Sequence, residues 1–130
     1  LNDLGYSYPT IAVYNSVGVS YLYPTIPVVF ASPANNVAAT GSLSTGTIAV
    51  TWADPTFASE AIAGYDVYLS WVDNTGTLQT SGATFVAAGS DMVTIPAVSG
   101  YTTFAITVVA VDSVGREGAY PLAGTTVILT

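Results

Sequence analysis

Short apolar runs that end at turn-forming residues are the feature that most limits how this chain can fold. Val, Ile, Thr and Tyr recur in brief stretches, and Gly, Pro, Asn and Ser separate them. Apolar residues at helical spacing are hard to find, and runs of this kind are typical of sandwiches and barrels. The sequence therefore predicts an all-β, antiparallel fold. The expected strands cover residues 37–40, 47–52, 64–72, 77–80, 84–87, 92–95, 101–112 and 125–129.

Turn-forming residues lie between these expected strands, at positions 44–46, 73–76 and 115–118. In the second turn, Asp73, Thr75 and Thr77 alternate as the first ligands of a calcium loop do. Such a loop also needs a bidentate acidic residue further on, and the sequence lacks one there. We therefore interpret residues 73–76 as a hairpin turn, and we predict no metal site.

The near absence of charge excludes several kinds of partner. The chain has 130 residues, the size of one ordinary domain, and only 7% are charged, against about 25% in a typical soluble domain. Arg116 is the only basic residue and the formal net charge is -7, so the counterion release that drives nucleic-acid binding has almost nothing to act on. The longest apolar run, residues 104–111, is far shorter than the ~20 residues of a membrane-spanning helix. We expect neither a nucleic-acid partner nor a membrane span.

Catalytic groups are scarce in this sequence. Because the chain has no His and no Cys, Ser-His-Asp and Cys-His arrangements and the common zinc sites are unavailable. Most of the carboxylates fall at predicted strand ends and in loops, and we interpret them as solvated loop acids rather than a paired acid and base. These are Asp54, Glu60, Asp66, Asp91, Asp112 and Glu117. The glycines match no phosphate-binding pattern. We predict no catalytic residue, no cofactor and no small-molecule substrate.

Five segments, taken in order, resemble a fibronectin type III domain. They read IAVTWADP at 48–55, IAGYDVY at 62–68, VSG at 98–100, FAITVVAVDSVG at 104–115 and TVI at 126–128. The resemblance covers residues 33–130. It implies an antiparallel, immunoglobulin-like β-sandwich, and residues 1–32 would then form an extended N-terminal arm.

Strand periodicity agrees with this resemblance. Ile48, Val50 and Trp52 share one face of their strand, as do alternate residues from Phe104, so two inward rows can oppose each other. The expected core residues are Trp52, Tyr65, Phe104, Ile106 and Val108. The family usually has a tyrosine at the position of Phe104, whose hydroxyl ties a corner to the backbone. Phe104 cannot make that bond, so we expect packing alone, or Tyr101, to hold the corner.

In this family the loop before the last strand, here residues 113–121, sometimes carries a tripeptide that cell-surface receptors recognise. This loop reads Gly-Arg-Glu-Gly at 115–118 and lacks that tripeptide. We therefore expect Arg116 to make only a local, exposed ion pair with Glu117 or Asp112, worth about 0 to 1 kcal/mol.

The N-terminal arm has the pattern of a strand with one buried face. From residue 11 to residue 23, apolar residues mostly alternate with small or polar ones. Pro9, Pro24 and Pro27 bracket this stretch and exclude a helix. We predict that its apolar face contacts a neighbouring subunit as a donor strand. This face comprises Ile11, Val13, Val17, Val19, Tyr21 and Tyr23.

The arm suggests assembly with other copies of the chain. Soluble monomers usually guard sheet edges with Lys, and this chain has none. The design is similar to that of extracellular pili and threads, in which a terminal strand joins the sheet of the next subunit. This similarity implies a head-to-tail homo-oligomer that forms a filament or layer at the cell surface. A chain that begins with Leu1 rather than Met also fits secretion.

Two alternatives remain open at this point. The arm can instead pair with its own domain as a hairpin, with a turn at Asn15-Ser16. The chain can also be a binding or spacer module of a larger secreted adhesin or enzyme. Such a module usually exposes aromatic side chains to its ligand. The candidates for that role are Trp71, Tyr6, Tyr8 and Tyr120.

Overall fold

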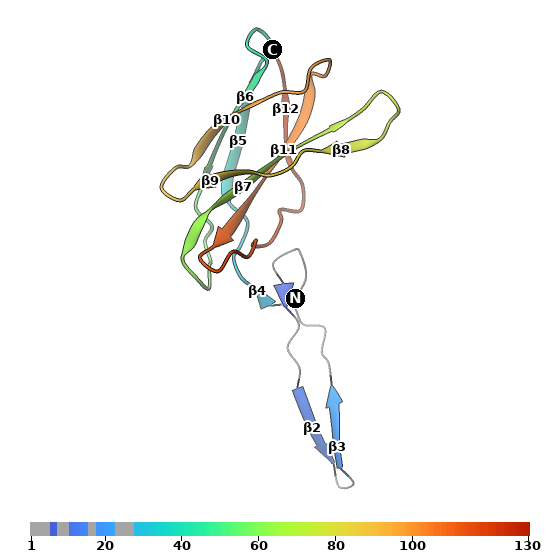
Figure 1. Ribbon diagram of the computed structural model, residues 1–130, viewed down its shortest axis with the longest axis vertical. Helices are drawn as coiled ribbons and strands as arrows, with labels where there is room; N and C mark the ends of the chain where they lie inside the picture. Colours follow the sequence, from blue (N-terminus) through green and yellow to red (C-terminus); the bar gives the residue numbers. More distant parts are fainter. Residues whose placement is uncertain (1–5, 8–10, 16–17, 23–27) are drawn as a thin grey trace.

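Two antiparallel sheets packed face to face form the body of the protein (Figure 1). The computed structural model describes residues 6–7, 11–15, 18–22 and 28–130, with side chains from residue 30 onward. The three-stranded sheet has the order β10-β6-β5, and the five-stranded sheet has the order β12-β11-β7-β8, with β9 also paired to β7. The strands are β5 (Asn35–Ser42), β6 (Thr47–Ala53), β7 (Ile62–Val72), β8 (Leu78–Thr80), β9 (Thr84–Ala87), β10 (Met92–Pro96), β11 (Thr103–Asp112) and β12 (Thr125–Ile128).

The all-β, antiparallel prediction is confirmed, and each of the eight expected strands is present with small shifts at its ends. No end shifts by more than two residues, and one such shift is at the start of β5, which begins at Asn35 rather than at residue 37. Asn36 adopts a φ of 51°, and the register shifts between Asn35 and Ala38, so a bulge lets the strand resume pairing. Among the described residues, no helix is long and apolar enough to cross a membrane.

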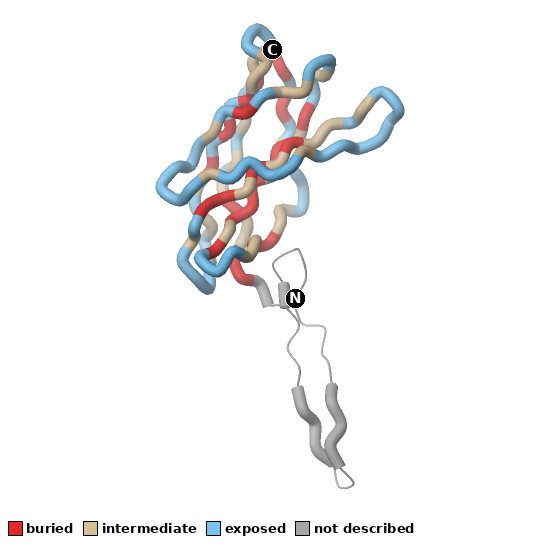
Figure 2. The backbone as a smooth tube through the Cα atoms, viewed as in Figure 1, coloured by how far each residue is buried: buried red, intermediate tan, exposed pale blue. Residues whose placement is uncertain are grey.

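Alternate residues of three strands fill the space between the sheets (Figure 2). In β6, Ile48 and Val50 are fully buried while Ala49 between them is exposed. The rings of Trp52 and Tyr65 meet across the core with centroids 5.3 Å apart. The residues that we expected in the core are 5% exposed or less; they are Trp52, Tyr65, Phe104, Ile106 and Val108.

Packing holds the corner at which the family usually has a tyrosine. Phe104 is only 1% exposed. The Tyr101 ring packs against Trp71, with centroids 6.4 Å apart. The backbone N–H of Leu129 donates to the carbonyl of Thr102 at 2.8 Å. Apolar contact and one backbone hydrogen bond therefore fix β11 and the end of the chain at this corner.

The arm contains two pairs of strands. β2 (Ile11–Asn15) pairs antiparallel with β3 (Gly18–Leu22), and β1 (Tyr6–Ser7) pairs with β4 (Val28–Val29). The expectation of one continuous strand from 11 to 23 is not met, because β2 and β3 run antiparallel and Asn15 pairs with Gly18. Asn, Ser and Gly at positions 15, 16 and 18 are turn-forming residues, and two strands so close in sequence pair at little entropic cost.

The chain reverses between β2 and β3, as the hairpin alternative expected, but Asn15 belongs to β2, and the two strands pair with each other rather than with the sandwich. In Figure 1, β2 and β3 lie beyond one end of the sandwich. Val17 and Tyr23 lie outside the described residues, as do the side chains of the other residues of the expected donor face, Ile11, Val13, Val19 and Tyr21.

Close packing of β9 on β7 gives a test of the sheet. A Cβ at Gly64 would lie 2.4 Å from the ring of Phe85 and 2.4 Å from the carbonyl oxygen of Val86. We expect Gly64→Ala to lower the free energy of unfolding by about 1 to 3 kcal/mol, because backbone must move to admit the methyl group. Gly82→Ala is the matched control, since a Cβ there meets nothing within 4 Å. Urea denaturation measures both, and equal midpoints would contradict the described packing.

Candidate functional surfaces

A buried carboxylate organises the loop after β11. Asp112 is 1% exposed, and its Oδ1 accepts hydrogen bonds from the backbone N–H groups of Val114 at 3.0 Å and Arg116 at 2.9 Å. Its Oδ2 accepts one from Nε of Arg116 at 2.9 Å. Burial alone would raise the pKa of Asp112, but the hydrogen bonds from Arg116 and Val114 outweigh it and lower that pKa. The local ion pair that we expected is present, but Asp112 is a buried structural group and not a solvated loop acid.

The same loop clamps the base of the arm. The guanidinium carbon of Arg116 lies 3.8 Å from the centroid of the Phe30 ring. The carbonyl of Phe30 accepts from Ser59 N–H at 2.8 Å, and the carbonyl of Ala31 accepts from Ala119 N–H at 2.9 Å. Two loops at one end of the sandwich therefore fix the segment from which the arm departs. We call this the arm end; it comprises residues 30–32, 54–61 and 112–119.

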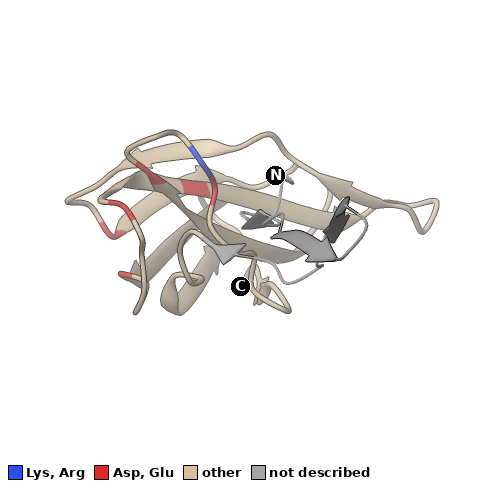
Figure 3. Cartoon of the chain, turned by 90° about the horizontal axis from the view of Figure 1, so that it is seen from below, with Lys and Arg blue, Asp and Glu red and all other residues tan. Residues whose placement is uncertain are grey.

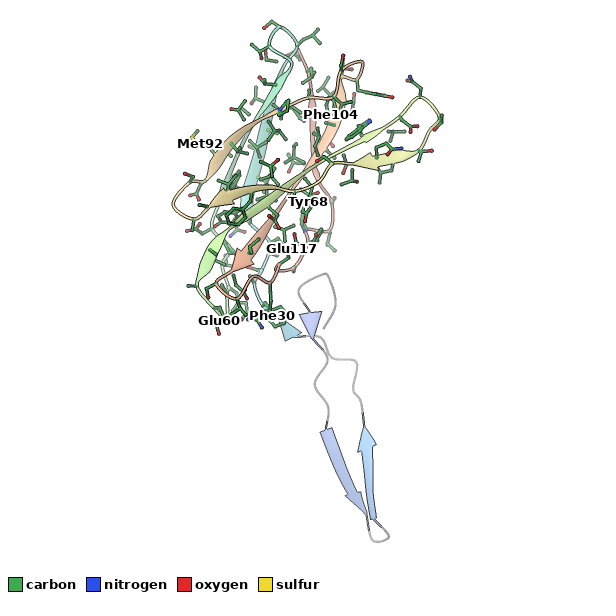
Figure 4. All side chains as sticks on the ribbon, in the orientation of Figure 1. Phe30, Glu60, Tyr68, Met92, Phe104 and Glu117 are labelled. Atoms are coloured by element: carbon green, nitrogen blue, oxygen red, sulfur yellow. The ribbon has the colours of Figure 1, made fainter. Side chains whose placement is uncertain are left out.

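Glu117 joins two tyrosines near the arm end, and Figure 4 shows it close to Tyr68. The hydroxyl of Tyr120 donates to Oε1 of Glu117 at 2.7 Å, and that of Tyr68 donates to Oε2. The two rings stack with centroids 6.0 Å apart. Burial, followed by the hydrogen bond and negative charge of Glu117, raises the pKa of Asp66 to about 6. The carboxylates of Asp66 and Glu117 therefore interact within this cluster. The hydroxyl of Tyr120, one of the expected ligand-contacting aromatics, is bound to Glu117.

The opposite end of the sandwich has two adjoining hollows without charged residues. The larger, of about 410 Å³, has Trp71, Val72, Leu78 and Tyr101 among its lining residues. The smaller, of about 270 Å³, shares Tyr101 and adds Leu43 from the turn after β5. Leu43, Val72 and Leu78 are each more than half exposed. We call this the apolar end; it comprises the turn 43–46, the loop 97–102 and the adjoining ends of β7, β8 and β12.

Carboxylates are concentrated toward the arm end. Seen from below in Figure 3, most acidic segments gather on one side of the sandwich, around the single basic residue. Figure 4 places Glu60, Glu117 and Phe30 toward the arm, and Phe104 toward the opposite end, where Figure 1 marks the C-terminus. Asp73 is separate from these groups, in the turn between β7 and β8.

The carboxylate of Asp73 accepts hydrogen bonds from residues of its own turn. Oδ1 of Asp73 accepts hydrogen bonds from the hydroxyl of Thr75 at 2.6 Å and from the backbone N–H of Thr77 at 3.0 Å, and these bonds lower its pKa. Gly76 has a φ of 82°, as the turn requires. The hairpin interpretation of residues 73–76 is confirmed. In the described part of the chain, no three acidic side chains come together as metal ligands would.

The sequence located some of these residues but not their partners. Trp71 lines the larger hollow, whereas the backbone of Tyr6 lies in β1 and Tyr8 lies outside the described residues. The alternation along β7 puts Asp66 and Tyr68 on its outer face, away from Tyr65. Their contacts with Glu117 and Tyr120 depend on how the loop after β11 returns over the sheet. The sequence carries no local signal for that path.

We expect Asp112→Ala to lower the free energy of unfolding by about 3 kcal/mol. The change removes a buried acceptor and leaves the N–H groups of Val114 and Arg116 without it. Glu60→Ala is the control, because Glu60 is an exposed carboxylate in a loop at the same end. Guanidinium denaturation of both variants checks this, and a loss for Asp112→Ala no larger than that for Glu60→Ala would refute the structural role of Asp112.

The Asp66 carboxyl makes thermal stability depend on pH. Its pKa rises from 3.8 to about 6 on folding, so the folded chain binds this proton more tightly than the unfolded chain. The resulting stabilisation is full below the unfolded value and is lost as pH rises through about 6. We expect the Tm to fall between about pH 4 and pH 7, and Asp66→Asn to reduce that fall. Calorimetry across this range measures it, and identical pH profiles would show that Asp66 titrates normally.

Comparison with known proteins identifies the fold. No protein-family model matches the sequence, and no curated protein matches it. Solved structures do match. A Fn3-like protein from Clostridium thermocellum aligns with a TM-score of 0.55 and 20% identity, over 78% of this chain and 95% of that one. The fn3 domain of human collagen alpha-1(XX) aligns with a TM-score of 0.53 and 20% identity, over 82% and 95%.

A third similar structure is that of domains d3-d4 of the rat CD45 extracellular region. It aligns with a TM-score of 0.50 and 14% identity, over 97% of this chain and 66% of that one. Identities this low indicate a shared fold and nothing beyond it. The chain therefore has the β-sandwich fold of fibronectin type III domains.

Proposed function

We propose that the chain is a non-catalytic structural module, a spacer or binding unit, on the outside of a cell. The observation that carries this proposal is that four of its carboxylates are engaged by the fold. Asp54 accepts from the hydroxyl of Tyr65, Asp73 from its own turn, Asp112 from Arg116, and Glu117 from two tyrosines. Groups held in this way are poor acids and bases for a substrate. Solved domains of this fold include parts of a collagen chain and of the CD45 extracellular region, which supports an extracellular place.

A second candidate function is self-assembly through the arm. It is favoured by the composition of the arm, since no charged residue occurs from Leu4 to Ala53. It is also favoured by the position of the β2–β3 hairpin beyond the sandwich, where it can reach another copy. This would make the chain the subunit of a filament or surface layer, as expected from the sequence.

The strands of the sandwich bear on whether the arm would insert into a neighbour or add to its surface. Residues 35–128 supply both sheets of the sandwich, so its own strands close the fold. β5 and the residue after β12 meet at Gly41 and Leu129, where a Cβ on Gly41 would lie 2.5 Å from the Leu129 side chain and 3.2 Å from its Cα. A donor strand inserted at this edge would have to separate segments that are this close. We therefore favour addition of the arm to the surface of a neighbour over insertion into its sandwich.

Removal of the arm separates the two candidate functions. We expect residues 30–130, which keep the clamped base of the arm, to unfold cooperatively as a monomer. We expect the full chain to show the same unfolding transition and to form larger species as concentration rises. Circular dichroism and sedimentation velocity measure these properties. An unfolded fragment would contradict the module, and a full chain that stays monomeric at every concentration would contradict self-assembly.

A further inference from the structure

We propose that the apolar end of the sandwich binds the β2–β3 hairpin of a second copy of this chain, so that copies join head to tail. This inference rests on the self-assembly candidate and adds the surface on which the arm docks. The occupant is identified from charge, from position in the fold and from a free sheet edge.

Charge limits where two copies can touch. Each copy carries a formal net charge of -7, so two copies repel unless their contact keeps carboxylates apart. Both hollows of the apolar end lack charged lining residues, and the arm is uncharged from residue 4 onward. A contact between two arm ends would instead bring the Glu60 and Glu117 side chains of both copies close together. Charge therefore favours a pairing of unlike ends.

The apolar end offers both a recess and an exposed apolar rim. The larger hollow measures about 410 Å³ and lies across the ends of β7, β11 and β12. At its edge, Val72 and Leu78 are 58% and 67% exposed. Apolar side chains gathered around a recess are typical of contact surfaces in proteins that associate. The uncharged, apolar arm has the matching composition, whereas a charged partner would lose its hydration there without gaining an opposite charge.

A free backbone edge adjoins this recess. β8 ends its path in the five-stranded sheet, and all three of its residues are exposed. Leu78 belongs to both β8 and the hollow, so a strand paired to β8 would lie beside the recess. Edge strands that no Lys guards are the ones to which strands of other chains add. A hairpin, which has two strands with outer edges of its own, can pair with β8 without unfolding.

Position in the fold makes this contact one between different copies. The arm leaves the sandwich from the arm end, where Phe30 and Ala31 are held by hydrogen bonds. The residues that line the hollows belong to the opposite end. A hairpin that occupies the apolar end of a neighbour leaves its own apolar end free for a third copy. Contacts between unlike surfaces of this kind propagate instead of closing as a dimer.

Cysteine cross-linking tests the contact directly, because the natural chain has no Cys. One sample carries Val13→Cys or, separately, Tyr14→Cys in β2, so that both faces of the hairpin are sampled. Each of these variants is mixed with full-length chain that carries Leu78→Cys, and the mixture is oxidised. The control partner is Met92→Cys on β10, whose side chain is 66% exposed, close to the 67% of Leu78. We expect at least one β2 variant to form the mixed disulfide with Leu78→Cys about tenfold faster than with Met92→Cys.

Four results would overturn the proposal. Equal rates with the two partners would show that the arm does not select the apolar end. Rapid cross-linking of Leu78→Cys to itself would show that apolar ends meet each other. Assembly of the natural chain without selective cross-linking would reject this surface while keeping self-assembly, whereas a monomeric natural chain would reject both.

A charge substitution gives an independent readout. Leu78→Asp places a carboxylate at the rim of the hollow, and Met92→Asp places one on the edge of the other sheet. Because both positions are exposed, each variant should keep the Tm of the natural chain. We expect Leu78→Asp to raise the concentration needed for assembly at least tenfold and Met92→Asp to leave it nearly unchanged, as measured by sedimentation velocity. Equal effects would overturn the proposed site.

Discussion

The contact between Trp52 and Tyr65 joins the two sheets, and the rest of the structure depends on the layer to which it belongs. Because β6, β7 and β11 each turn alternate residues into that layer, their directions and registers are set together. The inward row of β11 ends at Asp112, and that of β7 begins near Tyr65. Packing in the middle of the molecule therefore places the Asp112 carboxylate and the Tyr65 hydroxyl toward the arm end. There Asp112 binds Arg116, and Tyr65 binds Asp54.

A chain with one basic residue can give a salt bridge to Asp112 but must stabilise its other carboxylates in another way. It uses tyrosine hydroxyls, threonine hydroxyls and backbone N–H groups, as at Glu117 and Asp73. These donors occur where loops return to the sheets, so the acidic groups collect around the base of the arm. The other end keeps apolar side chains at its surface. The same shortage of basic residues thus gives the sandwich two chemically different ends.

Strand positions could be read from the sequence because each strand alternates against one common core. The same alternation includes Asp112, which follows Phe104 and Ile106 at even spacing, but its acidic character led us to interpret it as solvated. Val109 lies on the opposite face of β11 from Phe104 and Ile106, and it is nonetheless fully buried. Near the end of this strand, Val111 is bridged to Glu117. The pairing of Glu117 with Tyr68, and the return of the arm on itself, depend on contacts that no alternation encodes. Alternation cannot distinguish a long strand from a hairpin of two short ones.

The contacts of Arg116 have a consequence for resistance to proteases. Proteases that cut after Lys or Arg find a single target in this sequence, the peptide bond between Arg116 and Glu117. Such enzymes must draw the basic side chain into a pocket and the flanking backbone into an extended form. Here the guanidinium group is bound to Asp112 and lies over Phe30, and the backbone N–H of Arg116 is also engaged. The one site of tryptic cleavage is therefore closed by the contacts that hold the base of the arm.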